Sequence, residues 1–300
     1  MTNLVKLSVT LSLIFSINNV YADREAFEST YVPLAPEKIV IQNASIYDGD
    51  GGEFFETDVL VEDGKIIAIG KDLPFSNEFR VIDATGKWVT PGIIDIHSHM
   101  GVYPAPGVRT SSDGNEATSP VTADVWAEHS IWVQDPQYAL ALTGGVTAFH
   151  ILPGSANLIG GRGVTVKNLQ RNTINSMKFP EAPHSLKMAC GENPKRVYGN
   201  RGQAPSTRMG NAAGYRKSWI QAEGYLRRLN EYEEKSDEAK ELEYAPTRDL
   251  EMETLVGVLK GEILVHNHCY RADEMATMID IAKEFNYKIT AFHHGVEAYK

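Results

Sequence analysis

Apolar, strand-like segments alternate with helix-like segments along the sequence from Pro91 onward. Six of them have the composition of buried strands: residues 89–99, 146–152, 163–168, 185–190, 262–268 and 287–294. Between the last two, residues 271–285 place Met275, Met278, Ile279 and Ala282 on one helical face. Such alternation is typical of parallel strands joined by crossovers, so the sequence predicts an α/β fold with a sheet or a TIM-like (β/α)8 barrel.

Two longer stretches also have helical composition. Residues 123–145 are predicted to be helical and to end at the pair Gly144 and Gly145. Residues 219–253 are charged and helix-prone, which favours a solvated helix, with an interaction surface as the alternative.

A different pattern precedes Pro91. Short β-branched runs alternate with turn signals at residues 48–52 (DGDGG) and 62–65 (EDGK), which predicts a small antiparallel sheet, with another strand and turn before Pro91. Residues 23–37 are assigned to a linker, residues 38–90 to this small-sheet subdomain, and residues 91–300 to the barrel. A full barrel takes ~250 residues, so we expect its C-terminal strands to be missing from this sequence.

The first 22 residues have the pattern of a cleavable signal peptide. A lysine precedes the short apolar run at residues 7–17, and Val20 and Ala22 occupy the small-residue positions of a cleavage site. We therefore expect cleavage after Ala22 and a secreted or periplasmic mature protein. An uncleaved anchor is the alternative, although the apolar run is well short of the ~20 residues that span a bilayer. No membrane association of the mature chain is expected.

Charge and cysteine content narrow the possible classes of protein. The formal net charge is −10 and the acidic residues are dispersed, so the sequence has no basic face and nucleic acid is not an expected partner. Cys190 and Cys269 are the two cysteines of the sequence, too few for a disulfide framework. Two buried free thiols are predicted, with a bridge in an oxidising compartment as the alternative.

Histidines gather at the ends of three predicted strands. Six of the nine histidines in the sequence lie there: His97, His99, His266, His268, His293 and His294. Parallel barrels collect their catalytic side chains at the carboxyl ends of the strands, and imidazole is a common metal ligand. The sequence therefore predicts a metal site. Adjacent residues on a strand point in opposite directions, so His293 and His294 cannot both face its centre.

An anionic ligand is also expected near these histidines. Glu192 follows the strand at residues 185–190, and Lys187 lies within it. Lys187 can serve as a metal ligand only as a carbamate, formed with carbon dioxide; the alternative is a structural or substrate-facing cation. On the first strand, Asp95 shares one face with His97 and His99 because residues two apart point to the same side.

Taken together, these motifs resemble the amidohydrolase superfamily, in particular its imidazolonepropionase-like members. The resemblance rests on the small sheet, on VTPGIIDIHSH, on GVTAFHILPGSANLIGGRGVTVKN and on the histidines after two later strands. It covers about residues 38–300, and its most specific feature is the small sheet leading directly into D-x-H-x-H. It implies a (β/α)8 barrel with a β-sandwich subdomain and one or two divalent metal ions, usually zinc.

The resemblance also assigns roles to residues. It implies that His97 and His99 open the metal site, and that His266 and His294 are the ligands from the fifth and sixth strands. His268, His293 and Asp95 then lie behind the ligands or face the substrate. Some relatives use a carboxylated lysine in a strand like LKMACG and others a glutamate like that in GENP, and we favour Glu192 over Lys187. The family's general-base aspartate is expected beyond residue 300.

A glycine-rich stretch, PGSANLIGGRG, contains Gly154, Gly160, Gly161 and Gly163. Its spacing matches neither common nucleotide-binding motif, and it predicts a tight loop close to the site. Arg162 in this stretch is a candidate for binding a substrate carboxylate, with a surface arginine as the alternative.

These observations predict a metal-dependent hydrolase that uses metal-activated water on a carbon–nitrogen bond of a small amide, cyclic amide or peptide-like substrate. A single-metal deaminase is one alternative. The other is an inactive metal-binding remnant, or a fragment with an unfinished barrel. The sequence leaves open whether the protein forms a homo-oligomer.

Overall fold

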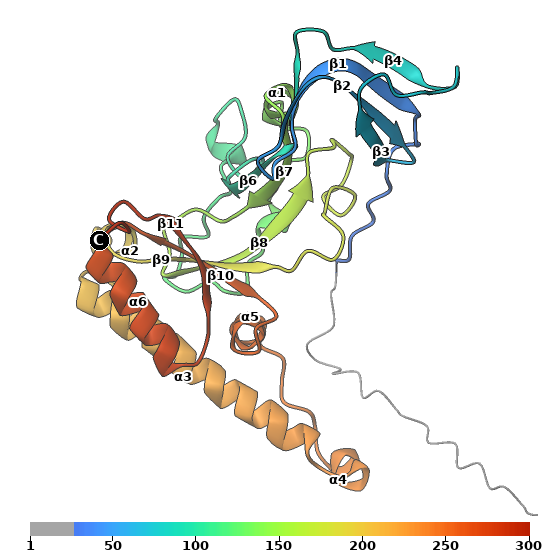
Figure 1. Ribbon diagram of the computed structural model, residues 1–300. Helices are drawn as coiled ribbons and strands as arrows, with labels where there is room; N and C mark the ends of the chain where they lie inside the picture. The colour runs from blue at the N-terminus through green and yellow to red at the C-terminus, as the bar shows by residue number, and fades with distance from the viewer. Residues whose placement is uncertain (1–26) are drawn as a thin grey trace, which may run out of the picture.

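The computed structural model describes residues 27–300, which form two β-sheets and the helices that cover the larger one (Figure 1). The predicted signal peptide and the start of the linker lie outside the described residues. Within residues 27–300, no helix is both long enough and apolar enough to cross a bilayer.

The smaller sheet is built by residues 39–89. Its strands are β1 (Ile39–Tyr47), β2 (Glu53–Glu62), β3 (Lys65–Gly70), β4 (Arg80–Asp83) and β5 (Trp88–Val89). The two predicted turns are confirmed, since they join β1, β2 and β3 as antiparallel neighbours. The antiparallel prediction is confirmed for β1, β2 and β3, whereas the additional strand region before Pro91, for which the sequence predicts no direction, forms β4 and β5, and both pair with β1 in parallel. Residues 71–79 carry the chain back along the sheet, so β4 starts level with the start of β1.

The larger sheet has the order β11-β10-β9-β8-β7-β6 and is curved like a barrel wall. Its strands are β6 (Ile93–Ser98), β7 (Val146–Ile151), β8 (Ile159–Lys167), β9 (Ser185–Ala189), β10 (Leu264–Cys269) and β11 (Ile289–His294). All six coincide with predicted strands, which confirms the α/β barrel class. The expected parallel direction is wrong for β8, which is antiparallel to both neighbours. Residues 152–158 between β7 and β8 are too few for a crossover, so the chain must return antiparallel.

The helices that follow β9 are α2 (Glu192–Gly199), α3 (Arg208–Glu233), α4 (Asp237–Leu242), α5 (Leu250–Leu259) and α6 (Ala272–Glu284). Of these, α3, α5 and α6 supply the apolar residues that pack on the outer face of the larger sheet, whereas α2 contacts α3 and α4 has no buried residue. The main apolar core lies between these three helices and β8, β9 and β10, with Trp219 and Leu255 fully buried. The helix predicted at residues 271–285 is confirmed as α6. Of its predicted face, Met275, Met278 and Ala282 are buried, but Ile279 is 41% exposed.

Two helix predictions fail in part. In residues 123–145 the structure has only a 3₁₀ turn (Ala127–His129) and α1 (Gln137–Thr143). Residues 121–126, which include the start of this stretch, pair with β8 instead, since Arg162 N donates to Val125 O and Thr122 N donates to Ile159 O. The predicted solvated helix at 219–253 is also wrong for α3, because one face of α3 is buried in the core.

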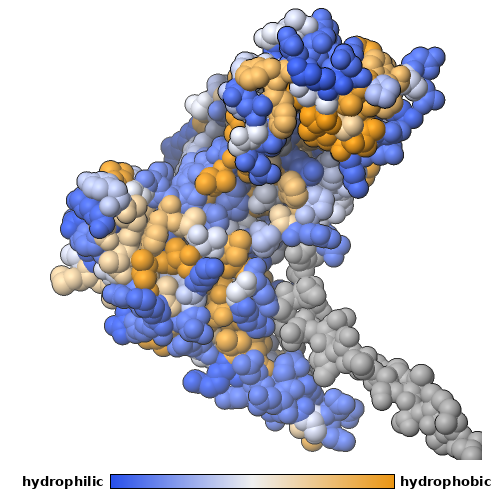
Figure 2. Space-filling view, in the orientation of Figure 1, coloured by the Kyte–Doolittle hydropathy of each residue, from blue (hydrophilic) through white to orange (hydrophobic). Residues whose placement is uncertain are grey.

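Apolar side chains remain exposed on both sheets. β3 presents Ile66, Ile67 and Ile69, and apolar surface gathers over the smaller sheet in Figure 2. On the larger sheet, Ile94 and Ile96 on the outer face of β6 are 63% and 64% exposed. β6 is an edge strand, and no described helix covers that face.

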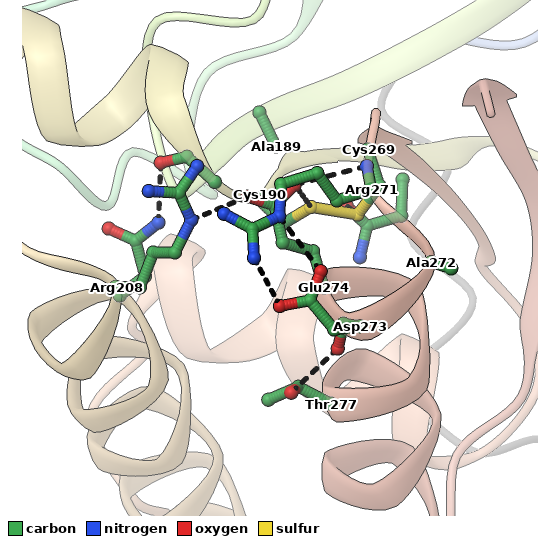
Figure 3. The surroundings of a disulfide bond; sticks show 12 residues. Ala189, Cys190, Arg208, Cys269, Arg271, Ala272, Asp273, Glu274 and Thr277 are labelled. Carbon is green, nitrogen blue, oxygen red and sulfur yellow. Dashed lines mark hydrogen bonds and ion pairs between the residues drawn. A yellow bond between two sulfur atoms is a disulfide. The ribbon is translucent and has the colours of Figure 1, made fainter. Parts of the chain in front are cut away.

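Cys190 and Cys269 form a disulfide (Figure 3), so the prediction of two free thiols is wrong. Cys190 directly follows β9 and Cys269 ends β10. Their Cα atoms are 5.2 Å apart, within the range that a disulfide can span, because the ends of neighbouring strands lie side by side. Sequence spacing alone did not reveal this neighbourhood.

We expect removal of this disulfide to lower stability substantially. The bridge closes a loop with a sequence separation of 79, which restricts the unfolded chain. The Cys190→Ala/Cys269→Ala variant should lose about 2–4 kcal/mol of unfolding free energy, measured by urea denaturation. Reductant should lower the stability of the wild type to a similar extent and leave the variant unchanged. Equal wild-type stability with and without reductant, with two titratable thiols already present, would contradict the bridge.

Candidate functional site

Polar side chains occupy the inner face of the larger sheet near the carboxyl ends of its strands. They come from five of the six strands and the residue after β6: Asp95, His97, His99, His150, Lys187, His266, His268 and His293. The outer-facing residues of the same strands, such as Leu186 and Val265, are buried in the apolar core. Strand alternation therefore separates the core from a polar interior.

His293 of β11 contacts one histidine of β6, at the opposite edge of the sheet, and one histidine of the neighbouring strand β10. Its Nδ1 lies 2.7 Å from His97 Nδ1, and its Nε2 lies 2.8 Å from His266 Nδ1. The ring of His99 is 5.1 Å from that of His97, and its Nδ1 is 2.8 Å from the carbonyl oxygen of Leu152. The structure thus brings together histidines that are far apart in the sequence.

His268 and His294 lie beside this group. His294 is exposed and has a backbone φ of 68° at the end of β11, whereas His293 is buried. The His294 ring is 4.4 Å from that of His268 and 4.9 Å from that of His97. Neither ring nitrogen of the buried His268 has a hydrogen-bond partner among the described residues. The assignment of His294, rather than His293, as a ligand stays a prediction.

Lys187 and Glu192 differ sharply in position. Lys187 is fully buried, pairs in register with His266, and donates from Nζ to the carbonyl oxygen of Pro153 at 3.0 Å. Burial lowers the pKa of Lys187 to about 7. Glu192 is exposed at the first position of α2 and makes no hydrogen bond to any described histidine. The structure therefore brings Lys187, and not Glu192, to the histidines.

The environment of the histidines keeps them neutral. Burial, and after it the charge of Lys187, lowers the pKa of His97 to about 2 and that of His266 to about 4. Burial and the neighbouring His266 lower the pKa of His293 to about 3. Desolvation disfavours the imidazolium form, so each ring retains a lone pair near neutral pH. A neutral imidazole is the form that binds metal ions.

The donor chemistry of this group fits a zinc-type metal ion, but the spacing of its atoms is contracted. Within residues 27–300, no three or more His, Cys, Asp or Glu side chains are arranged to hold a metal. The nitrogens of His293 touch those of His97 and His266 at 2.7 and 2.8 Å. Two nitrogens on one tetrahedral zinc lie about 3.3 Å apart, so His293 and a neighbouring ring would bind one ion through these facing atoms only if the two rings separated by roughly half an ångström.

Asp95 and Arg162 have structural contacts. Asp95 Oδ1 accepts a hydrogen bond from His97 N at 3.1 Å, which holds the backbone of β6. Arg162 lies on the outer face of β8, with its guanidinium 4.2 Å from the Trp126 ring and its Nε donating to Thr254 Oγ1. Strand alternation directs it away from Lys187. Its predicted contact with a substrate carboxylate stays a prediction.

The glycine-rich stretch forms strand rather than the predicted loop. Gly160, Gly161 and Gly163 all lie in β8, and only Gly154 lies in the preceding connection. A Cβ on Gly161 would lie 2.3 Å from Val125 O, and its φ is +109°. The glycines thus allow residues 122–126 and β9 to approach β8 closely.

A cavity of ≈530 Å³ adjoins the polar interior. Its walls include Val102, Asp124, Trp126, Pro153 and Gly160. Pro153 connects the two spaces, because its carbonyl oxygen accepts the hydrogen bond from Lys187. A concave space of this size beside converging polar groups is typical of a small-molecule site.

His150 is the inner-face residue that sequence reasoning missed. Its ring lies 4.6 Å from that of His266, and its nitrogens contact Thr165 Oγ1 and Ser185 Oγ. Unlike the six histidines at the ends of the first, fifth and sixth predicted strands, His150 has no other histidine one or two residues away. Its position in a predicted strand, where alternation places Ala148 and His150 on one face, was the available signal.

Comparison with known proteins identifies the class to which this fold and site belong. No protein-family model matches the chain. The crystal structure of an amidohydrolase from Thermotoga maritima MSB8 superposes with a TM-score of 0.79 at 39% identity, over 87% of this chain and 66% of that one. Amidohydrolase tasK of Hapsidospora irregularis is 36% identical over 269 residues, which are 84% of this chain and 27% of tasK. A dihydroorotase of Lactobacillus helveticus is 46% identical over 74 residues, 25% of this chain and 16% of that enzyme.

The chain belongs to the amidohydrolase superfamily. It spans just under two thirds of the Thermotoga chain and about a quarter of tasK. The fold predicted from the resemblance is confirmed by the structural match.

Substitution of Gly161 by alanine should disrupt the wall of the site. The new Cβ would meet a backbone oxygen and would force alanine into a backbone conformation that favours glycine. We expect a loss of at least about 2 kcal/mol in unfolding free energy. Gly107→Ala is the matched control, since nothing lies within 4 Å of a Cβ at Gly107. Equal stability of the two variants would contradict the close approach of residue 125 to β8.

Proposed function

We propose that this protein is a metal-dependent hydrolase that cleaves a carbon–nitrogen bond in a small amide, cyclic amide or peptide-like compound. The observation that carries the proposal is the convergence of neutral histidines from β6, β10 and β11 around the buried Lys187. Superfamily membership and the adjoining cavity support it. We also propose that the protein belongs to the imidazolonepropionase-like branch of the superfamily, because its motifs follow one another along the sequence as in that branch.

The proposed metal ligands are His97, His99 and His266, together with a histidine of the β11 end. When bound, a divalent ion, zinc by its donor set, lowers the pKa of water from 15.7 to ~7 and polarises the carbonyl under attack. Hydrogen bonds with other atoms of the chain orient these proposed ligands. Leu152 O fixes one nitrogen of His99, and Asp95 holds the backbone of His97.

We propose Lys187 as the anionic ligand, in place of Glu192, which the sequence favoured. For this role the amine nitrogen of Lys187 adds to the carbon of carbon dioxide and releases one proton, which leaves a carbamate with a single negative charge. Support comes from position: Lys187 is buried and faces His266, whereas Glu192 is exposed. A carbamate would also replace a buried positive charge with an anion that the histidine-bound metal can neutralise.

We further propose that the mature protein is exported, after cleavage behind Ala22. The disulfide between Cys190 and Cys269 supports an oxidising compartment. A deaminase with a single metal ion is the alternative reaction, and metal stoichiometry separates the two.

Metal analysis of purified protein is the first test. We expect one or two zinc equivalents in the wild type and loss of bound metal in His97→Ala and in His266→Ala, because ligands from both strands share the site. His129→Ala is the matched control, since His129 is exposed and lies outside the histidine group. A folded wild type without metal, or full occupancy in either site variant, would contradict the proposal.

A second test separates Lys187 from Glu192. Lys187→Ala should lose metal and amide hydrolysis, because its Nζ is the atom that carries the carbamate, and Glu192→Ala should retain both. Wild-type protein prepared without carbon dioxide should resemble Lys187→Ala until bicarbonate is added. Metal loss in Glu192→Ala with normal binding in Lys187→Ala would return the role to the glutamate. Circular dichroism of each variant checks that the fold is retained.

A further inference from the structure

A second polar cluster lies beside the histidine group on the inner face of the larger sheet. It consists of His150 from β7, Thr165 from β8 and Ser185 from β9. Ser185 is two residues before Lys187, so both side chains point to the inner face and Ser185 lies deeper. Barrel interiors at this depth are usually filled by branched apolar side chains. A histidine between two hydroxyl groups is therefore an exception that calls for a physical reason.

The hydroxyl groups hold the His150 ring from two sides. Its Nε2 lies 2.8 Å from Ser185 Oγ and its Nδ1 lies 3.0 Å from Thr165 Oγ1. In a neutral imidazole one nitrogen donates and the other accepts, so one hydroxyl accepts a hydrogen bond and the other donates one. His150 is 9% exposed and Ser185 is fully buried. Both nitrogens are satisfied, which fixes the rotation of the ring.

The fixed ring of His150 packs against His266. Their ring centroids are 4.6 Å apart with an interplanar angle of 37°. The hydrogen-bond contact of the His266 ring joins its Nδ1 to His293 Nε2. Its Nε2 makes no hydrogen bond with any described residue. Two contacts thus determine the direction of the His266 ring: the hydrogen-bond contact with His293 and the ring contact with His150.

We infer that His150 is a positioning residue for His266. Held by Ser185 and Thr165, it sets the orientation in which His266 presents its unbonded nitrogen. The inference rests on the proposed function, because it takes His266 to bind the metal. It adds a layer of residues that support a ligand without touching the metal or the substrate.

Cobalt binding to the full chain tests the inference. The first variant is His150→Ala, which removes the ring that packs against His266. The second is Ser185→Ala, which removes one of the two hydroxyl groups that hold His150. Ser176→Ala is the control, because it deletes a half-buried hydroxyl that bonds to Thr173 O outside the barrel interior. The readouts are the cobalt dissociation constant from chelator competition, the visible absorption spectrum of the cobalt protein, and thermal unfolding without metal.

We expect His150→Ala to weaken cobalt binding by about 10–100-fold and to alter the spectrum, with a smaller change of the same kind in Ser185→Ala. A lower unfolding temperature with unchanged affinity and spectrum in Ser185→Ala, or in a folded His150→Ala, would overturn the inference, because a purely structural role predicts that result. If His150→Ala does not fold, Ser185→Ala decides alone. Failure of the wild type to bind cobalt would instead reject the proposed function, and the inference with it.

Discussion

The parallel pairing of β9 with β10 is the constraint on which the core and the candidate site both depend. Its register places Lys187 opposite His266, and His268 opposite Ala189. The same register directs Leu186, Met188 and Val265 into the core beneath the helices. A slip by one residue would exchange these two sets of side chains. The apolar core therefore fixes which polar groups face the barrel interior.

Several contacts hold the ends of these two strands together. Cys190 is bonded to Cys269, and Cys190 N donates to the carbonyl oxygen of His268. Glu274 lies next to the bridge, where it accepts hydrogen bonds from Arg208 Nε and from Arg271 N (Figure 3). The bridge thus lies directly beside the histidines of β10. Cross-linking at this position stabilises the part of the sheet where the polar interior begins.

The polar interior is costly to bury, and the structure limits that cost by keeping charges few. The histidines are neutral, and His150 has both nitrogens satisfied by hydroxyl groups. Lys187 is the exception, with a buried amine whose hydrogen bond goes to a single backbone carbonyl. An arrangement of this kind contributes little to stability by itself. The presence of these histidines and of Lys187 in the interior is therefore better explained by the proposed metal chemistry than by a contribution to folding stability.

The sequence by itself determined the strands of the barrel, the turns of the small sheet and the gathering of histidines at strand ends, because these follow from local periodicity. It did not reveal the antiparallel direction of β8, the pairing of residues 122–126 with β8 or the disulfide, since each depends on which segments become neighbours. The choice between Lys187 and Glu192 as the proposed anionic ligand also depends on which segments become neighbours. Lys187 lies within the apolar run at residues 185–190 and Glu192 follows it; only the register between β9 and β10 turns Lys187 inward, while the start of α2 leaves Glu192 in solvent.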